Sequence, residues 1–131
     1  MRIPVSVGEV VDKITILDIK LDKMADPAQR ANVARERAAL QTAWDDSGLA
    51  WPAAEAAALA RVNRSLWDTE DVLRRLEAAQ DFGARFVALA RAVYVTNDER
   101  ARLKRHINAL LGSDLVEEKA YVDYAAPDLD P

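Results

Sequence analysis

An arginine interrupts the apolar seam of the last long helical segment. One heptad register runs through Phe82, Phe86, Leu89, Val93, Thr96, Arg100, Leu103, Ile107 and Leu110. An arginine that faces a core is costly to desolvate unless its charge is neutralised. Arg100 must therefore reach solvent, bind an anionic ligand or pair with a carboxylate. The candidate carboxylates are Glu9, Glu70 and Asp71.

A stripe of polar side chains lies beside this seam. At helical spacing, with Ala101 between them, it contains Tyr94, Asn97, Lys104 and Asn108. Such side chains make directed hydrogen bonds, whereas an ordinary solvated face carries mostly Glu, Lys and Arg. The stripe therefore either binds a ligand or fastens the C-terminal segment, whose Glu117 and Glu118 can pair with Lys104 and with the nearby Arg102 and Arg105.

These features favour a site for an anionic small molecule such as a nucleotide-sugar or phosphosugar. The candidate ligand-binding residues are Lys13, Trp67, Tyr94, Asn97, Arg100, Lys104 and Asn108. The three cations would supply charge, the tyrosine and asparagines would orient the ligand, and Trp67 would stack on it. A structural alternative exists for each part. Lys13, for example, lies four residues after Glu9, a spacing that by itself supports a helix.

Acidic pairs on helices suggest a different chemistry. Glu9 and Asp12 share one helix face, and so do Asp68 and Asp71; the candidate metal ligands are Glu9, Asp12, Glu70 and Asp71. All-α nucleotide pyrophosphohydrolases hold Mg²⁺ through comparable pairs, because Mg²⁺ prefers carboxylate oxygens and water. A magnesium-dependent hydrolase requires these four carboxylates to converge.

Several other chemistries are excluded by the residues present. The chain has no cysteine, which rules out disulfides, cysteine zinc sites, iron–sulfur clusters and thiol catalysis. It contains no glycine-rich phosphate loop, no G-x-S-x-G and no H-E-x-x-H. The single histidine, His106, is expected at the surface or boundary of the last helix. No catalytic residue can be assigned, and the sequence requires no cofactor.

The composition indicates one small helical domain. The 131 residues include only 4 glycines and 5 prolines, and they are 50% hydrophobic and 31% charged. The net charge of −4 argues against a nucleic-acid partner. Because the chain has neither an apolar run of membrane-spanning length nor a signal-peptide pattern at its start, the expected location is the cytoplasm.

Apolar periodicity and capping signals predict an all-α fold over residues 1–131. The expected helices cover residues 7–24, 27–45 and 52–80, and residues 82–111 form either one helix or two that join near Thr96. From Ser113 the chain is irregular, and Tyr121, Val122 and Tyr124 can pack on the helices as an extended arm. Residues 125–131 are expected to be a loose tail. The prediction is an antiparallel bundle of four to five helices with a C-terminal arm.

Four segments resemble a family of short bacterial proteins of unknown function. They read PVSVGEVVDKITILDIKLDK, LWDTEDVLRRLE, VYVTNDERARLKRHIN and GSDLVEEKAYVDY. The resemblance implies a setting among genes for cell-surface polysaccharides or glycosyl transfer. It implies no activity. The positions that define the type are Gly8, Glu9, Asp12, Lys13, Lys20, Trp67, Glu70, Asp71, Tyr94, Asn97, Asp98, Arg100, Lys104, Asn108, Glu117, Lys119 and Tyr121.

Three functional hypotheses therefore stand beside one another. The first is an accessory protein that binds an anionic small molecule. The second is a structural or interaction protein, either a homodimer or a protein that docks on a partner. Apolar surface beyond what one chain can bury would indicate the second. The third is the magnesium-dependent hydrolase.

Overall fold

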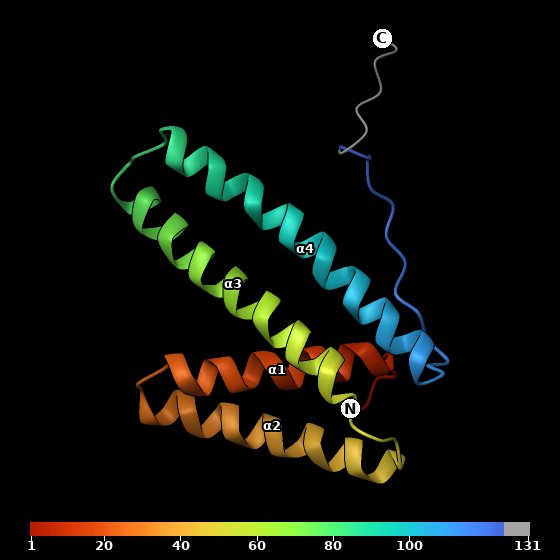
Figure 1. Cartoon of the computed structure of the whole chain (residues 1–131). Coiled ribbons are helices and arrows are strands. Elements are labelled where there is room, and N and C mark those ends of the chain that lie inside the picture. Colours follow the sequence, from red (N-terminus) through yellow and green to blue (C-terminus); the bar gives the residue numbers. More distant parts are fainter. Residues whose placement is uncertain (125–131) are drawn as a thin grey trace.

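The computed structural model describes residues 1–124 and contains four helices (Figure 1). They are α1 (Val7–Lys23), α2 (Pro27–Ser47), α3 (Ala53–Ala78) and α4 (Ala84–Leu110). No strand occurs in this part of the chain. The all-α prediction is confirmed, and the predicted helix ends lie within a few residues of the observed ones. The predicted loose tail, residues 125–131, lies outside the described residues.

The first two helices begin with the capping groups that the sequence predicts. The Oγ of Ser6 accepts a hydrogen bond from the Glu9 N–H at 3.3 Å. Asp26 accepts one from the Gln29 N–H at 2.9 Å, and Pro27 occupies the first turn of α2. A side-chain oxygen at the N-cap satisfies a backbone donor that has no partner inside the helix. These caps fix where α1 and α2 begin.

The last long segment is one helix rather than two. The capping pattern at Thr96–Glu99 does not break it, because α4 continues through these residues. Thr96 lies beside the groove between α3 and α4, near Val62 and Ser65. Asp98 accepts a hydrogen bond from the hydroxyl of Tyr124. Packing against α3 and the C-terminal segment thus takes precedence over the local capping signal.

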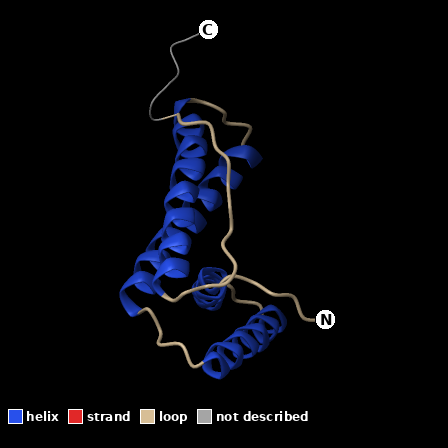
Figure 2. Ribbon diagram, turned by 90° about the vertical axis from the view of Figure 1, so that its right-hand side faces the viewer, coloured by secondary structure: helices blue, strands red, loops and turns tan. Residues whose placement is uncertain are grey.

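Helix α1 is the centre of the molecule, because it packs against each of the other three helices. The two hairpins, α1–α2 and α3–α4, cross where α1 meets the start of α3 and the end of α4 (Figures 1 and 2). The core cluster lies at this crossing and consists of Val11, Trp44, Ala56, Leu59 and Ile107. None of the helices in the described chain is long and apolar enough to cross a membrane.

After α4 the chain turns at Gly112 and runs back along α4 without regular secondary structure (Figure 2). Gly112 has a φ of 66°, in the left-handed region that glycine adopts without a steric penalty. Residues 113–124 are called the C-terminal arm below. The arm runs along α4 as predicted, and its path brings it over the polar stripe of α4; the prediction that Val122 packs on the helices is wrong, because Val122 is 86% exposed.

Candidate functional site

A buried ion pair joins α1 to α4. Asp12 has no exposed surface, and its carboxylate accepts hydrogen bonds from Nε of Arg100 at 2.9 Å and from Nη2 of Arg100. The two parallel bonds are the fork geometry in which a guanidinium recognises a carboxylate. The Arg100 side chain is 29% exposed, so the pair is closed on the Asp12 side and open on the other.

Two more polar groups from α1 and α3 complete this network. Nδ2 of Asn63 donates to Oδ1 of Asp12 at 2.8 Å and to Oγ1 of Thr15 at 3.0 Å. The Thr15 hydroxyl donates to the Asp12 carbonyl at 2.7 Å. Among the described residues, no buried side-chain nitrogen or oxygen lacks a hydrogen-bond partner. The network therefore holds three helices together with its polar groups satisfied.

The charge of Arg100 is neutralised inside the protein. Its hydrogen bond to Asp12 raises the pKa of Arg100 above its ordinary value, despite the opposing effect of burial. The partner carboxylate is Asp12, which is none of the three candidates named from the sequence. Arg100 is therefore first of all a structural cation, and a ligand would have to compete with Asp12 for it.

Lys104 forms a second ion-pair cluster, one turn further along α4. Its Nζ lies 2.6 Å from Oε2 of Glu9 and 2.8 Å from Oε2 of Glu117, and Lys119 lies 3.5 Å from the other oxygen of Glu117. Burial lowers the pKa of Lys104, but the hydrogen bonds to Glu117 and Glu9 outweigh it and raise the pKa above its ordinary value. Lys104 thus ties α1 and the C-terminal arm to α4.

The polar stripe of α4 fastens the arm, as one of the two sequence interpretations predicts. Beyond Lys104, Arg105 pairs with Glu118 at 2.8 Å. At the far end of the arm, the rings of Tyr94 and Tyr124 meet edge to face with centroids 5.4 Å apart. Exposed ion pairs such as Arg105–Glu118 contribute little singly. Their distribution along the whole arm fixes its path.

Gly8 and Asn108 bring the start of α1 against the end of α4. Oδ1 of Asn108 accepts a hydrogen bond from the Gly8 N–H at 2.6 Å. A neighbouring bond, from the Val7 N–H to Oγ of Ser113 at 3.0 Å, adds the base of the arm. The Asn108 residue is only 3% exposed, and it lines the cavity between α4 and the arm.

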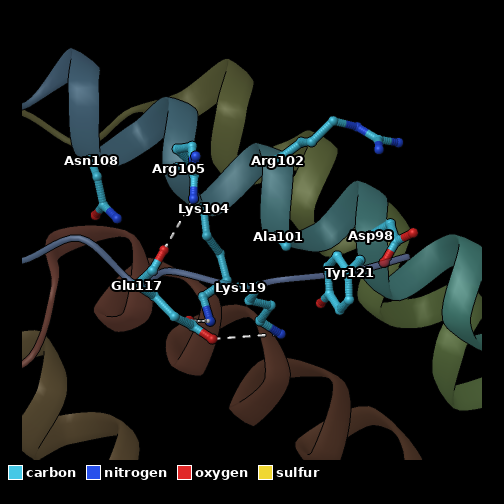
Figure 3. A pocket seen from close by; sticks show the side chains of 9 residues that line it. All are labelled: Asp98, Ala101, Arg102, Lys104, Arg105, Asn108, Glu117, Lys119 and Tyr121. Carbon is cyan, nitrogen blue, oxygen red and sulfur yellow. Dashed lines mark hydrogen bonds and ion pairs between the residues drawn. The ribbon is translucent and has the colours of Figure 1, made fainter. Parts of the chain in front are cut away.

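A cavity lies between α4 and the arm, and Figure 3 shows the residues around it. Its volume is about 260 Å³. Four cationic side chains and two carboxylates belong to its lining, which consists of Asp98, Ala101, Arg102, Lys104, Arg105, Asn108, Glu117, Lys119 and Tyr121. Nζ of Lys119 lies 5.8 Å from the centroid of the Tyr121 ring, within reach of a cation–π interaction. This space is called the arm cavity below.

The predicted ligand-binding residues are only partly brought together. Lys104 and Asn108 line the arm cavity, and Asn97 and Arg100 line a much smaller hollow that shares Lys104 and Lys119 with it. Tyr94 holds the end of the arm. Lys13 is exposed on α1, and the half-buried Trp67 on α3 does not line the cavity.

The predicted metal ligands are not gathered into a metal site. Asp12 is held by Arg100, and Glu9 by Lys104. Glu70 and Asp71 lie on α3, beyond its buried part. Within residues 1–124, no group of three or more His, Cys, Asp or Glu side chains is arranged to hold a metal ion. The magnesium-dependent hydrolase therefore gains no support from the geometry.

Only Lys104 and Asn108 of the cavity lining belong to the predicted ligand-binding set; the residues outside it include Arg102, Lys119 and Tyr121. Arg102 lies next to the stripe of α4, and the other two belong to the arm. Their types suit an anionic ligand, but their convergence depends on the path of the arm, which has no periodic signal. Asn63 was also missed, although an asparagine beside the apolar Val62 of α3 is itself an indication of a buried polar contact.

Acid is expected to release the arm. The hydrogen bond from Lys104 lowers the pKa of Glu117 below its ordinary value of 4.5. The contact therefore contributes fully above pH 4.5 and is lost as the pH falls through the lowered pKa of the folded state. NMR amide shifts of residues 115–124, followed from pH 7 to pH 3, should move toward those of an unfolded chain before the helix signals change.

The variant Glu117→Gln distinguishes the contribution of Glu117 to this pH dependence from those of Glu9, Glu118 and Asp98, which also face the arm or its cations. In Glu117→Gln the arm amides should already be shifted at pH 7, with a weaker pH dependence. An arm that stays in place at pH 3 in the wild type would contradict the assignment.

Comparison with known proteins gives one match. A protein-family model described as "Family of unknown function (DUF6165)" matches residues 1–128. Neither curated proteins nor solved structures gave a match to the chain.

Proposed function

The chain belongs to this family of unknown function, and from the geometry of its arm cavity we propose that it binds a small anionic molecule of the phosphosugar class. The observation that carries the proposal is the cluster of donor side chains in the cavity. Arg102 makes no ion pair among the described residues, and the amide of Asn108 lines the same space. Donors that converge in a partly enclosed space are what an oxyanion requires.

The charge balance of the cavity also favours an anion. Its two carboxylates are already engaged, because Asp98 accepts from Tyr124 and Glu117 accepts from Lys104. Of the four cations, Lys104 is fully committed to Glu9 and Glu117. Arg105 pairs with the exposed Glu118 and donates a long hydrogen bond of 3.5 Å to the Glu117 carbonyl, and a phosphate could displace both contacts at low cost. The cationic side chains that remain available to a ligand therefore outnumber the available carboxylates, which favours an anion.

The size of the cavity narrows the class of ligand. About 260 Å³ lies just below the range of about 300–1,000 Å³ that is usual for drug-sized ligands. A monosaccharide phosphate suits this volume better than a nucleotide-sugar does. Tyr121 supplies an aromatic ring and a hydroxyl at the wall, which suit a sugar. The polysaccharide and glycosyl-transfer setting that the sequence resemblance implies agrees with such a ligand.

Thermal-shift and calorimetric titrations test the proposal. Glucose 1-phosphate should raise the melting temperature, inorganic phosphate should raise it less, and glucose should leave it unchanged. At a ligand concentration of 100 times Kd, the expected stabilisation is about 2.7 kcal/mol. UDP-glucose should bind more weakly than glucose 1-phosphate. No shift with any of the phosphates would overturn the proposal.

Arg102→Ala identifies the site. Because Arg102 lines the cavity without an ion-pair partner, its loss should weaken glucose 1-phosphate binding at least tenfold and leave the fold intact. Lys119→Ala should also weaken binding. Arg91→Ala is the matched control, since Arg91 is an exposed arginine of α4 outside the cavity. Equal affinity in the Arg102 and Arg91 variants would place the ligand elsewhere.

A further inference from the structure

The outer part of the α3–α4 hairpin has no buried residue. Here the outer hairpin means residues 67–95, which project beyond α1 and α2 (Figures 1 and 2). The buried residues of α3 end at Leu66, and those of α4 begin at Lys104. Yet the outer hairpin carries many large apolar side chains, namely Trp67, Val72, Leu73, Leu76, Phe82, Phe86, Val87, Leu89, Val93 and Val95. Two helices alone do not cover them.

The chain exposes more surface than a compact monomer of its mass is expected to expose. Its accessible surface is 8928 Å². A compact monomer of 14.5 kDa is expected to expose about 6,900 Å². The C-terminal arm, the exposed residues 1–5 and the outer hairpin all contribute to the excess of roughly 2,000 Å². A standard interface removes about 800 Å² from each partner. The excess is therefore large enough for a stable dimer.

The charges of the outer hairpin favour a second copy of the same chain. Its α3 part, residues 67–78, has four acidic and two basic residues, whereas its α4 part, residues 84–95, has two arginines and no acid. Only Asp68 among these forms an ion pair in the described structure, with Lys23 of α1. Opposite charges thus lie on the two helices of one hairpin without pairing to each other. A two-fold axis would bring each helix against the other helix of the partner.

We propose that the outer hairpin is the interface of a homodimer. Two copies pack their outer hairpins face to face, with α3 of one protomer along α4 of its partner, and close a four-helix bundle. A two-fold interface uses the same patch on both chains, so one self-complementary hairpin is enough. Bundles of this kind bury the seams of paired helical hairpins. The arm cavity is not part of this interface, so the inference does not depend on ligand binding.

Sedimentation equilibrium tests the proposal directly. The chain should sediment at twice its mass of 14.5 kDa and dissociate on dilution. Val87 and Val95 project from α4 two turns apart and are 51% and 46% exposed, so glutamate at both positions is compatible with the fold of one chain. The Val87→Glu/Val95→Glu variant should dimerise at least a hundredfold more weakly and keep its helical circular dichroism.

Ile3→Glu is the matched control, because Ile3 is an apolar residue with 72% exposure that lies outside the hairpin. It should remain dimeric. Arg91→Glu, which removes one of the two positive charges of outer α4, should weaken the dimer at low salt more than at high salt. A chain that is monomeric at every concentration would overturn the proposal. So would a dimer that tolerates both glutamates.

Discussion

Asp12→Asn is expected to lower the free energy of unfolding by about 3 kcal/mol. The substitution keeps the shape of the side chain but removes the charge that neutralises Arg100, and it turns one oxygen acceptor into a donor. In either orientation of the amide, its N–H groups would then face the guanidinium of Arg100, and in one of the two they would also face the amide of Asn63. The value is at the lower end of the range for broken buried pairs, because Arg100 keeps 29% of its side chain exposed.

Urea unfolding measures this change, with Asp18→Asn as the control on the same helix. Asp18 pairs with Arg37 at 2.5 Å, but its side chain is 52% exposed, so the loss there should stay below about 1 kcal/mol. Similar losses of unfolding free energy in the two variants would show that burial does not make the Asp12 pair more stabilising than an exposed pair.

A double variant keeps the test informative if Asp12→Asn does not fold. Replacement of a whole buried pair by groups that need no counter-ion is far less costly than removal of one partner. Asp12→Asn with Arg100→Met should therefore recover a large part of the lost stability. Failure to recover would mean that the Asp12 side chain stabilises the fold mainly through its hydrogen bond from Asn63.

The sequence specifies helix faces much better than it specifies which faces meet. The seam register correctly marks Arg100 as a cation that needs an explanation, because period and desolvation cost are local properties. The identity of its partner depends on how far α1 and α4 slide and rotate against each other. Asp12 and Glu9 lie one turn apart on α1, and the observed offset places Asp12 at Arg100 and Glu9 at Lys104.

The same distinction explains which part of the cavity was predictable. Lys104 and Asn108 belong to a regular stripe on one helix, so their common face follows from spacing alone. The opposite wall comes from Lys119 and Tyr121, which lie on an arm without periodicity. The arm reaches Lys104 and Asn108 only because Gly112 turns the chain back along α4. The pairing of Lys104 with Glu117 was nevertheless foreseeable from opposite charge, and it is the contact that sets the register of the arm.

The ion pairs of Lys104 and the contact between Asn108 and Gly8 both depend on the close approach of α1 to α4. Lys104 is held by Glu9 from α1, and Asn108 is held by the backbone of Gly8 from the same turn. The cavity wall on α4 is therefore positioned by the first turn of α1. A change that separates these two helix ends should affect both stability and the proposed ligand, whereas a change in Arg102 should affect the ligand alone.

Gly8→Ala makes that separation and is expected to cost about 2–3 kcal/mol of stability. A Cβ at position 8 would lie closer than 3.0 Å to the carbonyl oxygen of Lys104 and at 2.9 Å from Oδ1 of Asn108. The first obstacle is backbone and cannot rotate away, so the helices must move apart. The higher helix propensity of alanine, worth about 0.5–1 kcal/mol, offsets only part of this cost.

Gly83→Ala is the control, because the nearest atom to its added Cβ is a flexible oxygen of Asp81 at 3.3 Å. Its stability should stay within about 0.5 kcal/mol of the wild type. Calorimetry on both variants should also show weaker glucose 1-phosphate binding for Gly8→Ala alone, since movement of Lys104 and Asn108 reshapes the cavity wall. A Gly8→Ala protein as stable as the wild type would mean that the junction of α1 and α4 yields easily. The inference that α1 positions the wall of the cavity would then be wrong.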